Sequence, residues 1–286
     1  MKKSISLLIA FSMVSVAGCT SVKSHVSPKG AVIDSGTWQA QFISEYDAFV
    51  SSDEFVRTGD PEKLVRDVEF YSLSETNMVT TETSVSGKTI KTTRNTTEEY
   101  TYSYDYGREL FQTVGEGKTK VKSNVSEEYG YDKEDTVYSV NRFYDNVNLT
   151  YTISPMPIKV YEAFANECSG FYTEAEGWYS MVKNGTFASS DTKCYKNGHI
   201  YTLYMEMNMA DIGYFKDAVG TVISVYQFKF DRKSVSISAL EEAKGVAYTD
   251  STGAKVKANG TSGTFKKLSF KDVTINYPNE ARYALM

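Results

Sequence analysis

The sequence predicts an α+β protein built on a large antiparallel sheet, with helices packed against it. Three observations support this class. The 286 residues include 22 Tyr and 15 Phe but only 5 Pro, and aromatic residues are typical of strands. Apolar residues alternate with period two through most of residues 78–153 and 200–277. Shorter stretches in between show helical spacing instead.

The first helix is expected at residues 38–50, where Trp38, Phe42 and Tyr46 recur at helical spacing. A second helix is expected at residues 61–72. Asp60, Pro61 and Glu62 form a typical helix start, and Leu64 and Val68 continue an apolar stripe.

Strands should follow as an antiparallel meander, because the period falls to two. We expect strands at residues 79–85, 89–97, 100–106, 110–114, 118–125, 128–131, 137–142 and 148–153. Within this meander Tyr100, Tyr102, Tyr104 and Tyr106 lie on one side of a strand. This tyrosine ladder either packs across strands or forms an exposed platform for a protein or glycan, and we favour packing.

Pro155 and Pro157 should end this meander, and helical spacing returns at residues 158–168 and again, in a shorter stretch, at 174–182. The sheet then resumes with strands at residues 200–209, 221–230, 234–240, 243–248, 254–258 and 265–277. No linker separates the two runs of strands, and neither run alone has a second layer to bury its sheet. We therefore expect one domain over residues 37–286.

The amino terminus reads as a targeting signal. Lys2 and Lys3 precede a short apolar run at residues 5–16, which ends in small residues and Cys19. This order resembles a bacterial lipoprotein signal peptide, although an ordinary secretory signal with an incidental Cys19 is the alternative. We expect removal of residues 1–18 and acylation of Cys19, for example with palmitate. The mature protein would then be extracytoplasmic and anchored by lipid to the bacterial cell membrane or outer membrane.

Residues 19–36 are mostly polar, with one apolar run at residues 31–33, and we expect them to form a flexible tether. The remaining cysteines, Cys168 and Cys194, would face an oxidising compartment after export, so we expect a disulfide between them. A redox or metal pair is the less favoured alternative, because the chain has no CxxC motif.

Composition excludes several function classes. Lys and Arg number 31 against 36 Asp and Glu, a net charge of −5, so a nucleic-acid partner is not expected. Only 2 His are present, and His199 follows a probable Asn-Gly turn. We therefore expect no metal site, no cofactor and no enzyme activity, reading the adjacent glutamate pairs as solvated.

The order of elements resembles a known family. A lipobox, a short tether, an amphipathic helix, a long meander, a helical interruption and a returning meander are similar to the LolA-like lipoprotein fold, including the LppX/LprG group. Residues 265–281, with the sequence FKKLSFKDVTINYPNEA, resemble the closing strand of such proteins. The resemblance spans residues 37–281 and implies a strongly curved antiparallel sheet, a half-open β-barrel of about 10–12 strands, with two to four helices on its concave face. It also implies a cavity between sheet and helices that holds acyl chains or lipoprotein tails. It transfers no ligand-contact residue.

The targeting signal and the resemblance together imply the expected function, a membrane-anchored lipoprotein that binds or carries a lipid or acyl chain in a cavity, and the Met and aromatic residues of the apolar stripes would suit such a ligand. The candidate cavity residues come from both predicted helices and from the strand at residues 200–209: Trp38, Phe42, Tyr46, Leu64, Val68, Tyr201, Leu203, Met205 and Met207. The alternative is a cell-surface interaction module without a cavity, binding a protein or glycan through its Tyr-rich strands.

Overall fold

The structure is a computed structural model of the whole chain. It describes residues 21–26, 28–52, 66–108, 110–119, 123–133, 136–144, 149–156, 160–188, 191–212 and 215–275. The predicted signal peptide, Cys19 and the first part of the predicted helix, residues 61–65 with Leu64, lie outside these residues.

One antiparallel sheet of twelve strands dominates the described chain, in the order β1-β8-β9-β10-β11-β12-β2-β3-β4-β5-β6-β7. The pairing of β12 with β2 joins the two meanders, which run outwards from this centre. The strands are β1 (Ala31–Ile33), β2 (Val68–Val85), β3 (Lys88–Asp105), β4 (Leu110–Thr119), β5 (Ser123–Lys133), β6 (Thr136–Tyr144), β7 (Leu149–Met156), β8 (Thr192–Asn197), β9 (Ile200–Asn208), β10 (Lys216–Asp231), β11 (Ser234–Thr249) and β12 (Lys255–Ser269).

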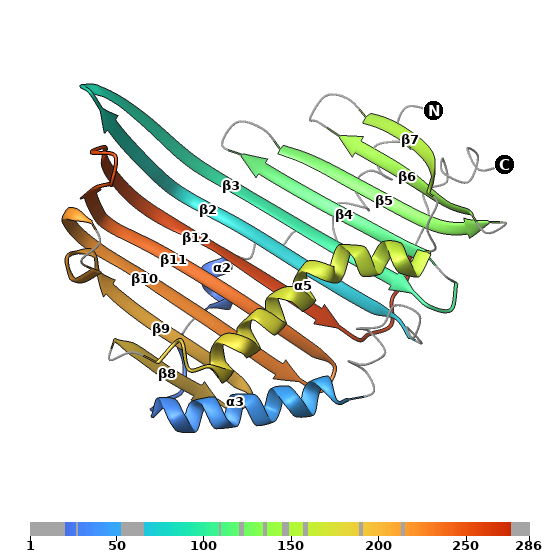
Figure 1. Cartoon of the computed structure of the whole chain (residues 1–286). Coiled ribbons are helices and arrows are strands. Elements are labelled where there is room, and N and C mark those ends of the chain that lie inside the picture. Colours follow the sequence, from blue (N-terminus) through green and yellow to red (C-terminus); the bar gives the residue numbers. More distant parts are fainter. Residues whose placement is uncertain are drawn as a thin grey trace.

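Two long helices pack on one face of the sheet: α3 (Ser35–Val50) and α5 (Val160–Lys183). A short helix, α2 (Val22–His25), lies on the opposite face, and a 3-10 turn, η2 (Met209–Ile212), follows β9. Figure 1 shows α3 and α5 in front of the sheet and α2 behind it. The expected α+β class, a curved antiparallel sheet with helices packed against it, is confirmed. We call the two surfaces the helical face and the opposite face.

The sequence predicts α3 well because its signals agree. Asp34 precedes the helix with extended backbone, and its side chain accepts a hydrogen bond of 2.8 Å from the Thr37 amide. This is a standard N-cap. Trp38, Phe42 and Tyr46 are its buried residues.

The predicted helix at residues 61–72 is wrong in its second half, because β2 begins at Val68. Val68 and Phe70 face the helical side, while Leu73 packs on the opposite side in a second cluster. A strand buried on both faces carries apolar residues at neighbouring positions, and such a run can imitate helical spacing.

Other elements are longer than predicted. The two helical stretches at residues 158–168 and 174–182 form a single helix, α5. Strands expected at 89–97 and 100–106 are one strand, β3, and those at 234–240 and 243–248 are one strand, β11. β12 covers the expected strand at 254–258 and ends at Ser269, so the strand predicted to reach residue 277 is shorter. The short strands β1 and β8 were not predicted.

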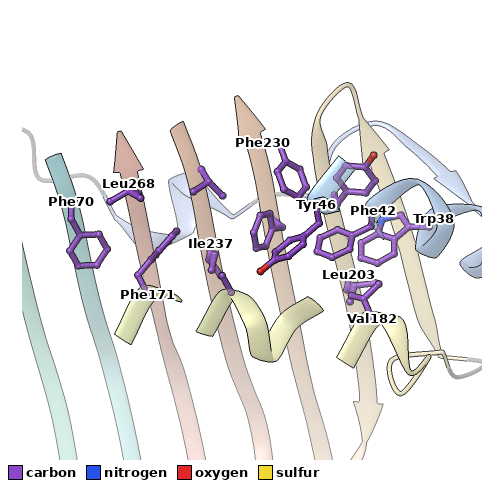
Figure 2. Packing of buried hydrophobic residues seen from close by; sticks show 14 of the residues in the cluster. Trp38, Phe42, Tyr46, Phe70, Phe171, Val182, Leu203, Phe230, Ile237 and Leu268 are labelled. Carbon is purple, nitrogen blue, oxygen red and sulfur yellow. The ribbon is translucent and has the colours of Figure 1, made fainter. Parts of the chain in front are cut away.

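Tight packing of aromatic rings fills the space between α3, α5 and the sheet. Phe42 is fully buried, and its ring centroid lies 5.5 Å from that of Tyr201 and 5.4 Å from that of Phe228. Further along α5, Phe171 packs on Phe70 of β2 at 5.6 Å. Figure 2 shows Phe42, Phe70 and Phe171 between the helices and the sheet. They form the main hydrophobic core, whose burial is the chief stabilising contribution.

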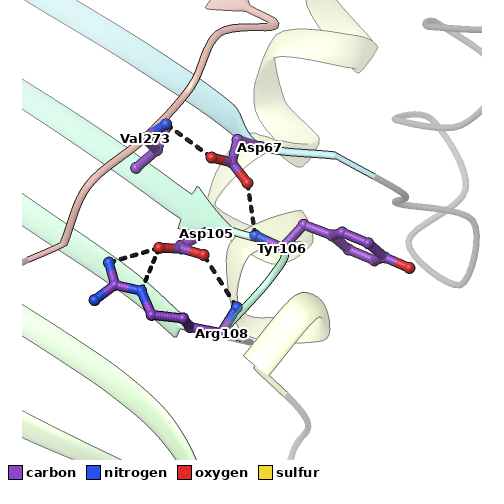
Figure 3. A network of polar contacts seen from close by, with 5 residues as sticks. All are labelled: Asp67, Asp105, Tyr106, Arg108 and Val273. Carbon is purple, nitrogen blue, oxygen red and sulfur yellow. Dashed lines mark hydrogen bonds and ion pairs between the residues drawn. The ribbon is translucent and has the colours of Figure 1, made fainter.

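A polar network closes the end of the sheet beyond this core (Figure 3). The Asp67 carboxylate accepts hydrogen bonds from the backbone amides of Tyr106, at 2.9 Å, and Val273, at 2.8 Å. Asp105 accepts from the Arg108 amide and pairs with its guanidinium at 2.6 Å. Asp67 therefore joins the start of β2, the β3–β4 turn and the segment after β12.

The predicted flexible tether is partly structured, which corrects the expectation for residues 19–36. Val22 and Val26 are buried against the opposite face, and β1 pairs with β8 along residues 31–33. The sequence signal was weak because only a few scattered apolar residues carry the docking. We call residues 21–30 the strap.

Candidate functional site

Most predicted cavity residues belong to the main core. Six of the nine lie in one buried cluster: Trp38, Phe42, Tyr46, Val68, Tyr201 and Leu203. The expected approach of the α3 stripe to β9 is confirmed, because the Trp38 and Tyr201 rings lie 5.6 Å apart. The rings also contact one another along α3, with Trp38 and Phe42 stacked at 5.4 Å. The rings themselves occupy the place where a ligand was expected.

A buried polar link fixes this cluster. Tyr201 donates a hydrogen bond of 2.6 Å from its hydroxyl to the Glu45 carboxylate of α3, which also contacts Nδ1 of His199. Burial, together with the bond to Glu45, raises the pKa of Tyr201. Burial likewise raises the pKa of Tyr46 to about 12. Both tyrosines are therefore neutral donors near pH 7. The ring of His199 is exposed, and the link attaches α3 to the start of β9.

The predicted disulfide is absent from the structure, because Cys194 carries a free, buried thiol. Neighbouring residues of α3 place it: Trp38 donates to the Tyr195 carbonyl, and Gln39 donates to the Val182 carbonyl near the end of α5. Cys168 lies 14 residues before Val182 on the same helix, about 21 Å away at 1.5 Å per residue. A disulfide requires Cα atoms within about 7 Å. Burial raises the pKa of the Cys194 thiol, which keeps it protonated.

The described residues hold no group of three His, Cys, Asp or Glu side chains arranged to bind a metal ion. The turn at residues 250–253 is stabilised by Asp250, whose side chain accepts hydrogen bonds from the amides of Thr252 and Ala254. Both bonds are accepted by the same carboxylate oxygen, Oδ1 of Asp250, which fixes the shape of the turn.

The tyrosine ladder packs, as favoured. Tyr104 is buried, Tyr102 stacks on Phe70 at 5.5 Å, and Tyr100 stacks on Tyr102 at 6.1 Å. Tyr106 lies beyond the strand in the turn and is 44% exposed. Three of the four rings therefore cover the sheet below α5 and do not form a free platform.

Helices α3 and α5 cover only part of the helical face of the sheet. α3 and α5 contact the starts of β9, β11 and β2 and the ends of β10, β12 and β3 through buried residues. Figure 1 shows the other ends of these strands extending beyond both helices. The burial of β3 follows this division, since its residues change from exposed at Lys88 to buried at Asp105.

Apolar side chains continue across this bare region. Met207 of β9 lies opposite Val222 of β10, and Tyr248 of β11 lies opposite Val256 of β12. The latter row continues through Thr83 of β2 to Ile90 of β3. Paired residues point to the same face of a sheet. We define the uncovered patch as Met207, Val222, Tyr248, Val256 and Ile90.

The uncovered patch combines exposure with an apolar surface. Ile90 is 70% exposed and Met207 is 44% exposed. Phe215 contributes at the rim, with its ring 4.4 Å from that of Tyr248. A polar row separates the patch from the core, because Ser224, Glu241, Ser262 and Thr76 are paired across β10, β11, β12 and β2. Exposed apolar patches of this kind are typical of binding surfaces.

Sequence reasoning found part of this region. Met205 and Met207 were candidates, and the structure places Met205 on the dividing row and Met207 in the uncovered patch. Val222, Tyr248, Val256 and Ile90 were missed. Alternation shows which residues share a face but not where along the strand the covering helix ends.

None of the described helices has both the length and the apolar character needed to cross a bilayer. No protein-family model and no curated protein matches the chain. A solved structure, that of Neisserial surface protein A (NspA), is similar over 68% of this chain and 95% of its own, at 7% identity and a TM-score of 0.15. Similarity at this level does not establish a shared fold or function.

Proposed function

We propose that the protein is an extracytoplasmic lipoprotein, anchored through Cys19 to the bacterial cell membrane or outer membrane, that binds the acyl chain of a lipid. The ligand would lie on the uncovered patch, not in the core as the sequence suggested. The observation that carries this proposal is the bare apolar region beside the helices, with Met207 and Ile90 exposed.

Physical chemistry supports an acyl ligand. From Met207 on β9 to Ile90 on β3 the patch crosses six adjacent strands, or about 24 Å at the usual strand spacing. Each methylene that leaves water contributes about 0.8 kcal/mol. The patch consists of aliphatic residues, Met and Tyr, which make adaptable contacts with a chain of variable length. The resemblance to LolA-like lipoproteins supports the same class of ligand.

The experiment is extraction and mass spectrometry of lipid from purified protein, followed by titration with a fluorescent fatty acid. Met207→Asp should weaken binding at least about tenfold, because it places a charge against the chain. Val219→Asp is the matched control: Val219 is 54% exposed and pairs with Ala247 on the opposite face. Equal affinity of wild type and Met207→Asp would contradict the proposed site.

A surface interaction module remains the second candidate. The dense packing of Trp38, Phe42 and Tyr201 favours it, since a filled core needs no ligand. Its partner would be a protein or glycan. The fatty-acid titration described above distinguishes this candidate from the lipid-binding one. Protein that carries no lipid and binds no fatty acid would support the module.

A further inference from the structure

We propose that the opposite face of the sheet lies directly against the bilayer that holds the Cys19 lipid, because the strap fixes the anchor at the centre of that face. This inference rests on the acylation of Cys19 in the proposed function. The occupant is the headgroup region of the anchoring membrane.

Several contacts dock the strap. The Val22 amide and the Ser21 hydroxyl donate hydrogen bonds to the Glu75 carboxylate of β2, at 3.0 and 3.3 Å. Val22 is fully buried, and Val26 is 3% exposed. His25 stacks on Phe265 of β12, with ring centroids 4.0 Å apart.

The sheet has space shaped for this strap. Gly263 of β12 has no side chain, and a Cβ atom there would lie 2.6 Å both from Cγ1 of Val22 and from the carbonyl oxygen of Ala239 in the neighbouring strand β11. Any larger residue would push Val22 out of its place. Docking therefore depends on the strap and on β12 at one position near the middle of that strand.

The docking point lies near the centre of the sheet, both across the strands and along them. β12 and β2 are the sixth and seventh of the twelve strands in the sheet order. Glu75 lies seven residues from the start of β2 and ten from its end, so the nearer end is about 23 Å away. The sheet edge beyond β1 is about 24 Å away across the strands.

The anchor cannot reach that far. Only Thr20 separates Cys19 from Ser21, and two residues span at most about 7 Å. A bilayer approaching the end or the edge of the sheet would stay beyond reach of the acylated sulfur. While the strap is docked, the bilayer must meet the opposite face.

The composition of that face suits headgroups better than acyl chains. It carries mixed charge, including the exposed Lys229 and Lys257 and the ion pair between Lys91 and Glu82 at 2.9 Å. Lysines near an anionic surface gain about 1 kcal/mol each. The uncovered patch then points away from the anchoring membrane, so a lipid ligand would arrive from the other side.

The test uses the full chain, processed and lipidated by its bacterial host and added to vesicles of phosphatidylethanolamine and phosphatidylglycerol. A membrane-impermeant amine reagent labels lysines, and mass spectrometry reads each site. A second protein carries a Gly-Ser spacer of about 20 residues between Thr20 and Ser21, which reaches about 25 Å on average. This spacer lengthens the anchor without touching the docked residues.

We expect several-fold weaker labelling of Lys229 and Lys257 in the wild type than in the spacer protein. Lys88 at the β2–β3 hairpin and Lys183 at the end of α5 should label equally in both proteins. Equal labelling of Lys229 and Lys257 would overturn the inference. The intact mass distinguishes the premises: an unmodified Cys19 refutes the anchor itself, whereas lipidated protein with equal labelling refutes only the orientation.

Discussion

The covered and uncovered halves of the helical face share the same strands but differ in chemistry. Towards the helices, strand residues such as Phe70, Phe228 and Phe230 are large and buried. Beyond the polar row, small residues such as Thr81, Ala243 and Ala258 lie between the few larger apolar side chains of the uncovered patch, such as the exposed Met207 and Ile90. Large rings need a second layer to leave water, whereas small side chains and Thr tolerate exposure. The helices therefore mark where the core ends, and the uncovered half of the helical face is available for a partner.

The largest effect should come from removing a ring from the covered half. Phe42→Ala should cost about 3–5 kcal/mol of unfolding free energy, because a fully buried ring leaves a cavity. Ile90→Ala, in the uncovered half, should change stability by less than about 0.5 kcal/mol. Denaturant unfolding of both variants measures the contrast. Equal losses would mean that the uncovered half is packed as well.

The second-largest loss of stability should come from the polar network around Asp67. Asp67→Ala removes two hydrogen bonds that its carboxylate accepts from backbone amides. We expect a loss of about 2–3 kcal/mol, because bonds to charged groups are stronger than neutral ones. Asp67→Asn should recover part of the lost unfolding free energy, because its amide oxygen can still accept a hydrogen bond. A stability unchanged in Asp67→Ala would show that the three joined segments do not depend on one another.

A smaller effect is expected where α5 crosses β12 within the covered half. Glu174 of α5 pairs with Lys266 of β12, and both side chains are about one-quarter exposed, at 27% and 26%. Glu174→Gln should cost about 1 kcal/mol or less, because solvent screens part of the attraction. Thermal unfolding at low and high salt measures this loss of unfolding free energy. A loss of several kcal/mol would mean that solvent does not screen the pair.

The smallest effect concerns the strap on the other face. Burial lowers the pKa of His25, and Glu99 opposes this only in part. The group therefore binds fewer protons when docked than when free, so docking weakens as pH falls below about 6.5. Hydrogen exchange of the strap amides at pH 7.5 and 5.5 should show faster exchange at the lower pH. His25→Gln should remove this dependence, and a pH dependence that persists in it would exclude His25 as the cause.

The sequence predicted the fold class, α3 and most strands, because capping and alternation are local signals. It missed that Val68 starts a strand, because the surroundings of β2 are apolar on both faces. It placed a disulfide between Cys168 and Cys194, because spacing along the chain says nothing of where a helix carries one of them. It assigned the strap to a tether, since Val22 and Val26 become meaningful only beside Gly263 and Leu73.

The central claim is that a hydrophobic ligand lies on the uncovered patch. The most direct measurement is photo-crosslinking with a diazirine-bearing fatty acid, with the modified peptides mapped by mass spectrometry. The account predicts adducts within residues 205–209 and 243–258, and their loss in Met207→Asp but not in Val219→Asp. Adducts concentrated at Trp38 and Tyr201, or spread without preference over both faces, would contradict it.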